Sequence, residues 1–444
     1  MKISPARQAA LEFIHRDRWL DEDWDLLIER SLASPKLADA RDRRLFTHLV
    51  SGTVRLIGRL DDRIERLTGR DSFDDAAQAA LRLALFQLEE SERLPAHAVI
   101  GESVEWVKRL RGPRLAGWLN AQLRNWQRGG VPGPERRFED DPQAYCEYEL
   151  SYPDWLVRRW IAELGPERAR GICEAMNGRE GIAFRWNRRR PGLAAFLDSL
   201  REEGCEPRLR EDLPWAFRVT AAVPARIWRA LEAGDLSVQD EAAQGVAPLL
   251  LPAPGTWVDL CAAPGGKTGH LAELAPPGAT ILALDRSASR LEKVVANLKR
   301  LGFSELRCEV GDLLEFAPRP ADAVLLDAPC TALGVLAENP DARWRKAEGQ
   351  IARLAETQKA LLGAAAAWVK PGGLLVYSVC TLTPEETIQR RDAFLERFPN
   401  FRLERIRPEE AGSAKVGPDG DLLIWPDKAG GSGSYAVRFR RMDA

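Results

Sequence analysis

Short apolar runs recur through the second half of the chain, with helical spacing between them. The runs cover residues 256–260, 280–285, 305–310, 323–327 and 373–377. Apolar residues follow a helical period most clearly over 287–301 and 348–369. Strands that are apolar on both faces and alternate with helices are typical of a parallel sheet covered on both sides. The pattern predicts a Rossmann-like α/β domain over residues 237–444.

The first part of the chain has a different pattern. Residues 1–128 show only helical apolar stripes and predict an all-α domain. The Pro/Gly-rich run 129–134 opens a linker that we place at 129–145. Residues 146–236 mix helical spacing with a strand at 182–186 and predict a small α+β domain. The expected fold class is therefore multidomain, α and α/β.

The first predicted strand of the α/β domain runs into a loop of small residues. The loop consists of Cys261, Ala262, Ala263, Pro264, Gly265 and Gly266, and a helix is expected to open near Lys267. Glycines let a ligand approach the backbone, and free amides at a helix start favour anionic or polar groups. The dinucleotide pattern Gly-x-Gly-x-x-Gly and the Walker lysine pattern are both absent. The loop alone is therefore equally consistent with a tight turn that merely closes a βα unit.

Acidic residues follow the later strands. Asp285 stands 20 residues after Gly265 (285 − 265), where a doubly wound fold places the carboxylate that binds a ribose diol. Asp312 and Asp327 end the third and fourth strands. In such a sheet the ligand lies at the carboxyl ends of the strands. We expect these acids to line one edge together with Cys330 and Cys380, whose strands should be neighbours roughly 5 Å apart.

Three runs carry a family resemblance. Residues 259–268 (DLCAAPGGKT), 327–330 (DAPC) and 378–382 (SVCTL) resemble, in order and spacing, the motifs of Sun-type RNA cytosine-C5 methyltransferases, which use S-adenosylmethionine. Residues 43–55 and 95–104 are similar to the NusB-like helical domain of the bacterial 16S ribosomal RNA branch of that family. The resemblance covers essentially the whole chain and implies methylation of C5 of a cytosine in 16S ribosomal RNA. It also implies a small RNA-recognition-like domain over 146–236.

The resemblance assigns roles to the site residues. Cys380 would be the nucleophile, Cys330 would assist product release, and Asp327 would lie between the cofactor and the cytosine. The S-adenosylmethionine site would consist of Cys261 (through its backbone), Ala262, Ala263, Pro264, Gly265, Gly266, Lys267, Asp285, Asp312 and Asp327. The chemistry requires such a thiol, because C5 of cytosine is a poor nucleophile until a thiolate adds at C6. DNA cytosine-C5 methyltransferases place the nucleophile in a Pro-Cys motif, so exchanged roles for the two cysteines remain open.

Several basic residues are candidates for RNA contact. Arg185 and Arg188–Arg190 beside Trp186 are expected to combine phosphate contact with base stacking. A second group consists of Arg343, Arg345 and Lys346. The arginines of the helical domain could form a solvated face or an RNA contact; they are Arg41, Arg43, Arg44, Arg55 and Arg59. Residues 384–386 are expected to cap the helix after Cys380.

Composition and charge bear on the partners and the cellular location that we expect. The chain has 64 Lys and Arg against 66 Asp and Glu, which argues against a wholesale polyanion coat but not against local basic patches. We expect no signal peptide, no membrane span and no metal, and a cytoplasmic monomer as the working form. Four of the seven cysteines are expected to be small buried hydrophobes: Cys146, Cys173, Cys205 and Cys308.

Two departures and two rival functions complete the interpretation. The chain departs from the pattern of the Sun-type family at two places. Val379 stands where the family usually has threonine, and Gly433-Ser434 stands where the family commonly has two aromatic residues. The target cytosine must be unpaired or flipped, because C6 is inaccessible within a stacked helix. The rivals are a transfer RNA methyltransferase of the same chemistry and a catalytically silent RNA-binding assembly factor.

Overall fold

A computed structural model describes residues 2–71, 73–90, 94–130, 136–178, 181–220, 223–407, 410, 416–426 and 431–443. Most of the expected linker run 129–134 lies outside these residues. The chain forms two compact units. The helical unit comprises Met1–Asn177 with Leu336–Glu348, and the sheet unit comprises Gly178–Val335 with Gly349–Ala444. Among the described residues, no helix combines the length and apolar character that a membrane crossing requires.

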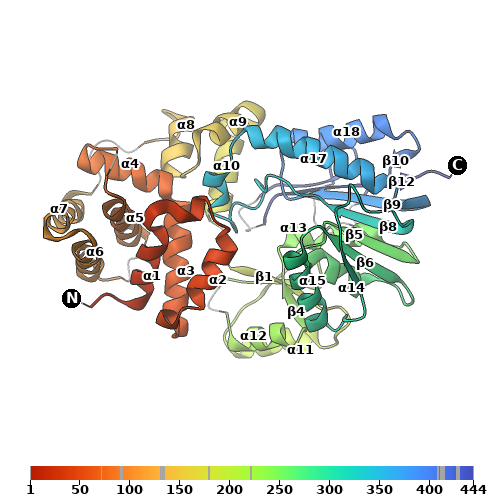
Figure 1. Ribbon diagram of the computed structural model, residues 1–444, viewed down its shortest axis with the longest axis horizontal. Helices are drawn as coiled ribbons and strands as arrows, with labels where there is room; N and C mark the ends of the chain where they lie inside the picture. The colour runs from red at the N-terminus through yellow and green to blue at the C-terminus, as the bar shows by residue number, and fades with distance from the viewer. Residues whose placement is uncertain are drawn as a thin grey trace. The chain divides into compact units, whose positions relative to one another are not determined.

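The helical unit is all-α, as its apolar stripes predict (Figure 1). Its α-helices are α1 (Pro5–Ile14), α2 (Trp24–Leu32), α3 (Ala40–Arg55), α4 (Ile57–Thr68), α5 (Asp75–Glu90), α6 (Ala96–Arg111), α7 (Pro113–Gly129), α8 (Pro142–Ala144), α9 (Asp154–Leu164), α10 (Pro166–Asn177) and α16 (Ala342–Arg345). Shorter turns are η1 (His15–Leu20), η2 (Pro35–Leu37) and η3 (Tyr145–Glu149). Phe46, Leu49 and Val50 of α3 lie at helical spacing and are fully buried in its core. Gly52 is required there, because a Cβ would lie 2.1 Å from the Phe86 ring.

The arginines expected on one face of this unit divide into two groups. Arg41, Arg43 and Arg44 are exposed. Arg55 donates to the carbonyl of Ala337 at 3.1 Å, and Arg59 pairs with Glu89 at 3.2 Å. Of these five arginines, only Arg41, Arg43 and Arg44 therefore remain candidates for a basic surface that contacts RNA.

The segment 336–348 belongs to the helical unit through two side chains. Arg343 is fully buried and donates to the Ser151 carbonyl and Asn177 Oδ1, both at 3.0 Å. Its guanidinium lies 4.0 Å from the centroid of the Tyr152 ring. Trp344 donates to the Val54 carbonyl at 2.7 Å. The expectation that Arg343 holds the RNA backbone is wrong, because its side chain is buried and its guanidinium is hydrogen-bonded within the protein.

The other two members of that basic group differ from Arg343. Arg345, the last residue of α16, is half-buried and pairs at 3.0 Å with Asp341, the residue before that helix. Lys346 is half-buried, and its contact with RNA stays a prediction.

The sheet unit contains the predicted doubly wound sheet. Its strands are β5 (Thr256–Leu260), β6 (Thr280–Asp285), β7 (Arg307–Val310), β8 (Ala321–Asp327), β9 (Val369–Val379), β10 (Phe401–Leu403), β11 (Leu422–Ile424) and β12 (Ser434–Arg441). The order is β10-β12-β9-β8-β5-β6-β7, with β11 beside β12, and the strands from β9 to β7 are parallel. The prediction that the strands before Cys330 and Cys380 are neighbours is confirmed, since β8 pairs with β9 and Asp327 aligns with Ser378.

Helices cover both faces of this sheet (Figure 1). On one face lie α14 (Gly266–Leu274) and α15 (Ala288–Leu301), whose Leu271 and Val294 pack with Trp257. On the other lie α17 (Gly349–Ala366) and α18 (Ile388–Arg397), whose Leu362 and Phe394 share a core with β8 and β9. The turns η4 (Ala247–Leu250) and η5 (Pro384–Glu386) and the short helix α13 (Glu241–Gln244) also belong to this unit. The apolar character of the strands on both faces follows from this double cover.

Three C-terminal strands were not among the predicted elements. Strand β12 pairs antiparallel with β9, β10 and β11, so the sheet is mixed. The geometry also accounts for the missing aromatic at position 433. A Cβ on Gly433 would lie 2.8 Å from Leu382 Cδ1 and 3.1 Å from the Gly334 Cα. Any side chain at this position would therefore require Leu382 and Gly334 to shift.

A second, smaller sheet lies in the same unit. Its strands are β1 (Ile182–Trp186), β2 (Arg208–Leu209), β3 (Ala216–Val219) and β4 (Leu236–Val238), in the antiparallel order β2-β3-β1-β4. It packs with α11 (Leu193–Glu202) and α12 (Ala225–Glu232) around Phe184 and Phe217. The α+β character expected between the two larger domains is present in this sheet.

Candidate active site

The small-residue loop turns sharply between β5 and α14. Cys261 has a left-handed backbone with φ 64°, and Gly265 has φ 98°. A Cβ on Gly265 would lie 3.0 Å from the Val294 Cα, so glycine is needed both for the turn and for its closeness to α15. The first amides of α14 have no partner within the helix, so they can receive an anionic group.

Asp285 holds this loop at the end of β6. Its side chain is buried; one oxygen accepts from the Ala263 amide at 3.0 Å and the other from the Ser287 amide at 2.9 Å. Each carboxylate oxygen has further lone pairs that could accept from a ribose diol. Asp312 is exposed and accepts from the Leu314 amide at 3.0 Å. This set of donors and acceptors fits the carboxylate and ribose of S-adenosylmethionine.

Asp259 is a buried acid that the sequence motif contains but that we did not single out. Its Oδ2 accepts from the Thr268 hydroxyl at 2.6 Å. Burial raises its pKa to about 7, against the opposing effect of that hydrogen bond. Asp259 therefore links β5 to α14.

The two cysteines of the predicted site meet at the carboxyl ends of β8 and β9. Their sulfur atoms are 3.3 Å apart, and both side chains are half-buried. The hydrogen bond between the two sulfurs lowers the pKa of Cys380 and raises the pKa of Cys330. The pair thus holds one sulfur that ionises readily and one that keeps its proton.

Asp327 connects this pair to the cofactor loop. It accepts from the Ser378 hydroxyl and from Lys267 Nζ, both at 2.7 Å. Burial lowers the pKa of Lys267, but the attraction of Asp327 outweighs it, so the net pKa is raised and the ammonium stays charged. At Cys380 the Asp327 carboxylate raises the pKa, and the Lys267 ammonium lowers it. The sequence placed Lys267 in the cofactor loop; the structure adds its contact with Asp327.

Glu386 anchors the loop that carries Cys330. The buried carboxylate accepts from the Thr331 amide and the Gln358 amide, both at 2.9 Å, and from the Thr383 hydroxyl at 2.7 Å. The expectation that residues 384–386 cap the following helix is therefore wrong for Glu386, which binds the neighbouring loop instead. The sequence signal was its place soon after Cys380, but no local pattern identifies Thr331 as its partner.

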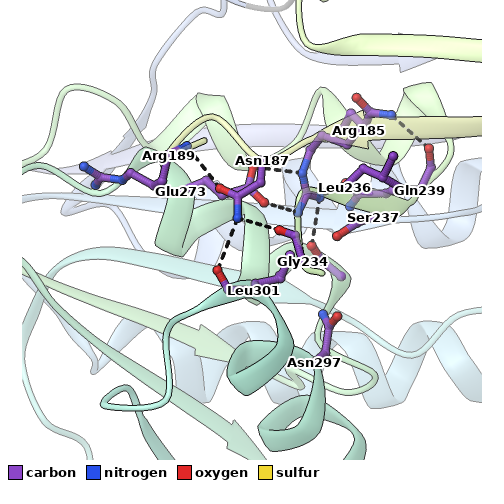
Figure 2. Close-up of polar contacts among 12 residues, drawn as sticks. Arg185, Asn187, Arg189, Gly234, Leu236, Ser237, Gln239, Glu273, Asn297 and Leu301 are labelled. Carbon is purple, nitrogen blue, oxygen red and sulfur yellow. Dashed lines mark hydrogen bonds and ion pairs between the residues drawn. The ribbon is translucent and has the colours of Figure 1, made fainter. Parts of the chain in front are cut away.

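Arg185, the first residue of the predicted basic cluster, belongs to a network of polar contacts within the protein (Figure 2). Arg185 is fully buried, donates to Glu273 at 2.7 Å and to the Gly266 carbonyl at 3.2 Å, and also binds Gln239. Trp186 is buried and packs against Phe196. The expected phosphate contact of Arg185 and base stacking of Trp186 are wrong, because Arg185 ties β1 to α14 and Trp186 packs within the small sheet's own core.

The remaining arginines of that cluster are exposed. Arg188 lies over the Trp215 ring at 4.7 Å, Arg189 binds the Ala275 carbonyl, and Arg190 lies 3.7 Å from Asp235. Their contact with RNA stays a prediction.

The other cysteines lie away from the reactive pair. Cys146, Cys173 and Cys205 are buried, as predicted, whereas Cys308 is half-buried. Burial raises the pKa of Cys261 to about 12, which agrees with a role through its backbone. Among the described residues, no group of three or more His, Cys, Asp or Glu side chains is arranged to hold a metal ion.

Three family descriptions match the chain. The 16S rRNA methyltransferase RsmB/F family matches residues 248–440, the NusB family residues 4–128, and the ferredoxin-like domain of RsmF/B-like methyltransferases residues 152–226. They confirm the fold class and the family resemblance. The compact units divide the chain at Asn177, so the expected domain limits stay predictions.

Relatives match over most of their length. Ribosomal RNA small subunit methyltransferase B of Klebsiella pneumoniae (strain 342) is 35% identical over 83% of this chain and 84% of the relative. A probable enzyme of the same name from Bacillus subtilis is 33% identical over 99% and 100%. The crystal structure of PH0851 aligns with TM-score 0.82 and 26% identity over 99% of this chain and all of that one. NSun6 from Pyrococcus horikoshii with SFG aligns with TM-score 0.58 at 23% identity over 67% and 100%, which shows a shared fold.

Proposed function

Because the chain belongs to the ribosomal RNA small subunit methyltransferase B family, we propose that it transfers a methyl group from S-adenosylmethionine to C5 of a cytosine in 16S ribosomal RNA. One observation carries the cytosine-C5 chemistry: two thiols 3.3 Å apart at the edge of the sheet where the cofactor loop and Asp327 also lie. S-adenosylmethionine supplies the methyl group as a sulfonium donor.

Cys380 is the nucleophile in this proposal. Its lowered pKa increases the thiolate fraction, and the thiolate adds to C6 of the cytosine, which makes C5 able to accept the methyl group. A base then removes the C5 proton, and the C6–sulfur bond breaks. Lys267 stabilises the thiolate before attack and after release, because its charge lowers the pKa of Cys380.

Cys330 serves the exit step. Its sulfur lies 3.3 Å from the Cys380 sulfur, and its raised pKa keeps its proton in place until the thiolate leaves. Asp327, held by Ser378 and Lys267, is positioned to accept a hydrogen bond from the cytosine. The cytosine reaches this site unpaired or flipped, because a thiolate cannot attack C6 within a stacked duplex.

The test compares wild type with Cys380→Ala and Cys330→Ala. Labelled S-adenosylmethionine and unmodified 16S RNA are supplied, and covalent RNA–protein adducts are followed on a denaturing gel. We expect Cys380→Ala to lose transfer by on the order of 10⁴-fold or more and form no adduct, and Cys330→Ala to accumulate one. An adduct that persists without Cys380 and vanishes without Cys330 would exchange the two roles.

Two other functions predict different results. A transfer RNA enzyme of the same chemistry would methylate transfer RNA and leave 16S RNA unlabelled. A silent assembly factor would bind RNA without transfer or adduct. The intact Cys330, Cys380 and Asp327 arrangement supports the catalytic alternative over the silent one.

A further inference from the structure

A hollow of about 620 Å³ lies in the helical unit, away from any residue assigned above. Its lining includes Arg70, Phe73, Asp74, Arg111, Arg114 and Trp118. They come from the end of α4, the start of α5, and the α6–α7 corner. Its volume lies within the range of small-ligand sites, and its lining combines three arginines with two aromatic rings.

The aromatic side chains offer a stacking surface. The ring centroids of Phe73 and Trp118 are 5.3 Å apart with an angle of 35° between their planes. Both residues are half-buried, so each is supported by the core and keeps part of its ring accessible. Such supported rings stack on nucleobases of any sequence.

The arginines around the rings are not all neutralised. Arg111 pairs with Asp74 at 2.7 Å and lies 3.5 Å from Asp75. Arg70 and Arg114 are exposed, and the described residues give neither side chain an acidic partner. These two guanidinium groups therefore remain available for an anion at the rim.

The corner between α6 and α7 adds charge to the same rim. Lys108, Arg109, Arg111 and Arg114 fall within seven positions, and all four are exposed. Arg109 is neutralised by Glu105 at 2.9 Å, whereas Lys108 adds an exposed charge. Stacking rings beside uncompensated cations are the combination that binds single-stranded nucleic acid.

We propose that this hollow binds one unpaired nucleotide of the RNA substrate, with its base on Trp118 and Phe73 and its flanking phosphates on Arg70 and Arg114. The inference rests on the proposed function in taking RNA as the substrate. It assigns to the helical unit a substrate contact of its own, made without the cysteine site.

The experiment uses the full chain and a fluorescein-labelled oligouridylate, with binding followed by anisotropy over a range of salt concentrations. Trp118→Leu should weaken binding about 5- to 100-fold. Arg114→Gln should lower the magnitude of the log–log salt slope by about 0.7, the value for one phosphate contact to a single strand. Arg124→Gln is the matched control, because Arg124 lies on the same helix, is exposed and hydrogen-bonds Gln127 outside the hollow.

Two results would overturn the proposal. One is a Trp118→Leu protein that melts like wild type and binds RNA equally well. The other is an Arg114→Gln salt slope equal to that of Arg124→Gln, which needs no folding argument because Arg114 is exposed. Methyl transfer to 16S RNA by wild type is measured in parallel. If wild type methylates 16S RNA but the variants bind RNA as wild type does, the nucleotide site in the hollow is refuted and the proposed function stands. If the variants bind RNA more weakly but wild type does not methylate 16S RNA, the proposed function is refuted and the nucleotide site stands.

Discussion

In each of two pairs of cysteines the two thiols are joined by a hydrogen bond, but the two pairs have different surroundings. The site pair is Cys330 with Cys380; the helical pair is Cys146 with Cys173. In each pair a hydrogen bond between the thiols lowers the pKa of one member, and the pKa of the other is raised. The helical pair is fully buried, whereas both members of the site pair are half-buried.

The charges near the two pairs do not separate them. At Cys380 the Asp327 carboxylate raises the pKa and the Lys267 ammonium, which Asp327 holds, lowers it. At Cys146, Arg170 lowers the pKa and Glu174 raises it. A contact between two thiols is therefore not in itself a sign of catalysis. Access to the sulfur atoms distinguishes the reactive pair.

The largest expected contrast is in alkylation. Iodoacetamide at pH 7.5 should modify Cys380 on the order of 10³-fold or more faster than Cys146 or Cys173. The buried thiols react only after a local opening that costs about 4 kcal/mol or more. Peptide mass spectrometry over a time course measures the three rates. Equal rates would remove the distinction drawn between the pairs.

A smaller effect is expected when the cation is removed. Lys267→Met takes away a positive charge that lowers the pKa of Cys380, so that pKa should rise and the alkylation profile of Cys380 should move to higher pH. Methyl transfer should fall about 10²-fold. Lys299→Met, at an exposed position on α15, is the control. An unchanged profile in Lys267→Met would show that the thiol contact alone sets the pKa.

The smallest effect should appear in the helical pair. Cys173→Ala leaves a small buried cavity and should lower the free energy of unfolding by about 1–3 kcal/mol, measured by urea denaturation, with methyl transfer unchanged. Cys380→Ala should show the reverse, with transfer lost and stability nearly retained. A Cys173→Ala protein that folds but loses transfer would give the helical pair a catalytic role.

The sequence was most informative where chemistry and topology coincide. Strand ends place Asp285, Asp327, Cys330 and Cys380 at one edge of a parallel sheet, so their proximity could be predicted without knowing any side-chain contact. The lysine of the loop was visible too, although its partner Asp327 lies 60 residues away (327 − 267).

The predictions for the basic residues were less reliable. Arg185 and Arg343 are both charged residues, and both are fully buried. Glu273 neutralises the first from 88 residues away, and carbonyl, amide and hydroxyl oxygens surround the second. Local composition cannot distinguish a buried, satisfied guanidinium from an exposed one, because the groups that satisfy it lie far along the chain.

The placement of residues 336–348 with the helical unit has a consequence for how such proteins can be recombined. Neither unit is a single uninterrupted stretch of the gene. If residues 178–444 were joined to the N-terminal helices of another protein, they would carry Arg343 and Trp344 without the Ser151 and Val54 carbonyls that these side chains bind. The front domain and this internal segment must therefore be inherited as a matched set, and a functional chimera has to exchange both together.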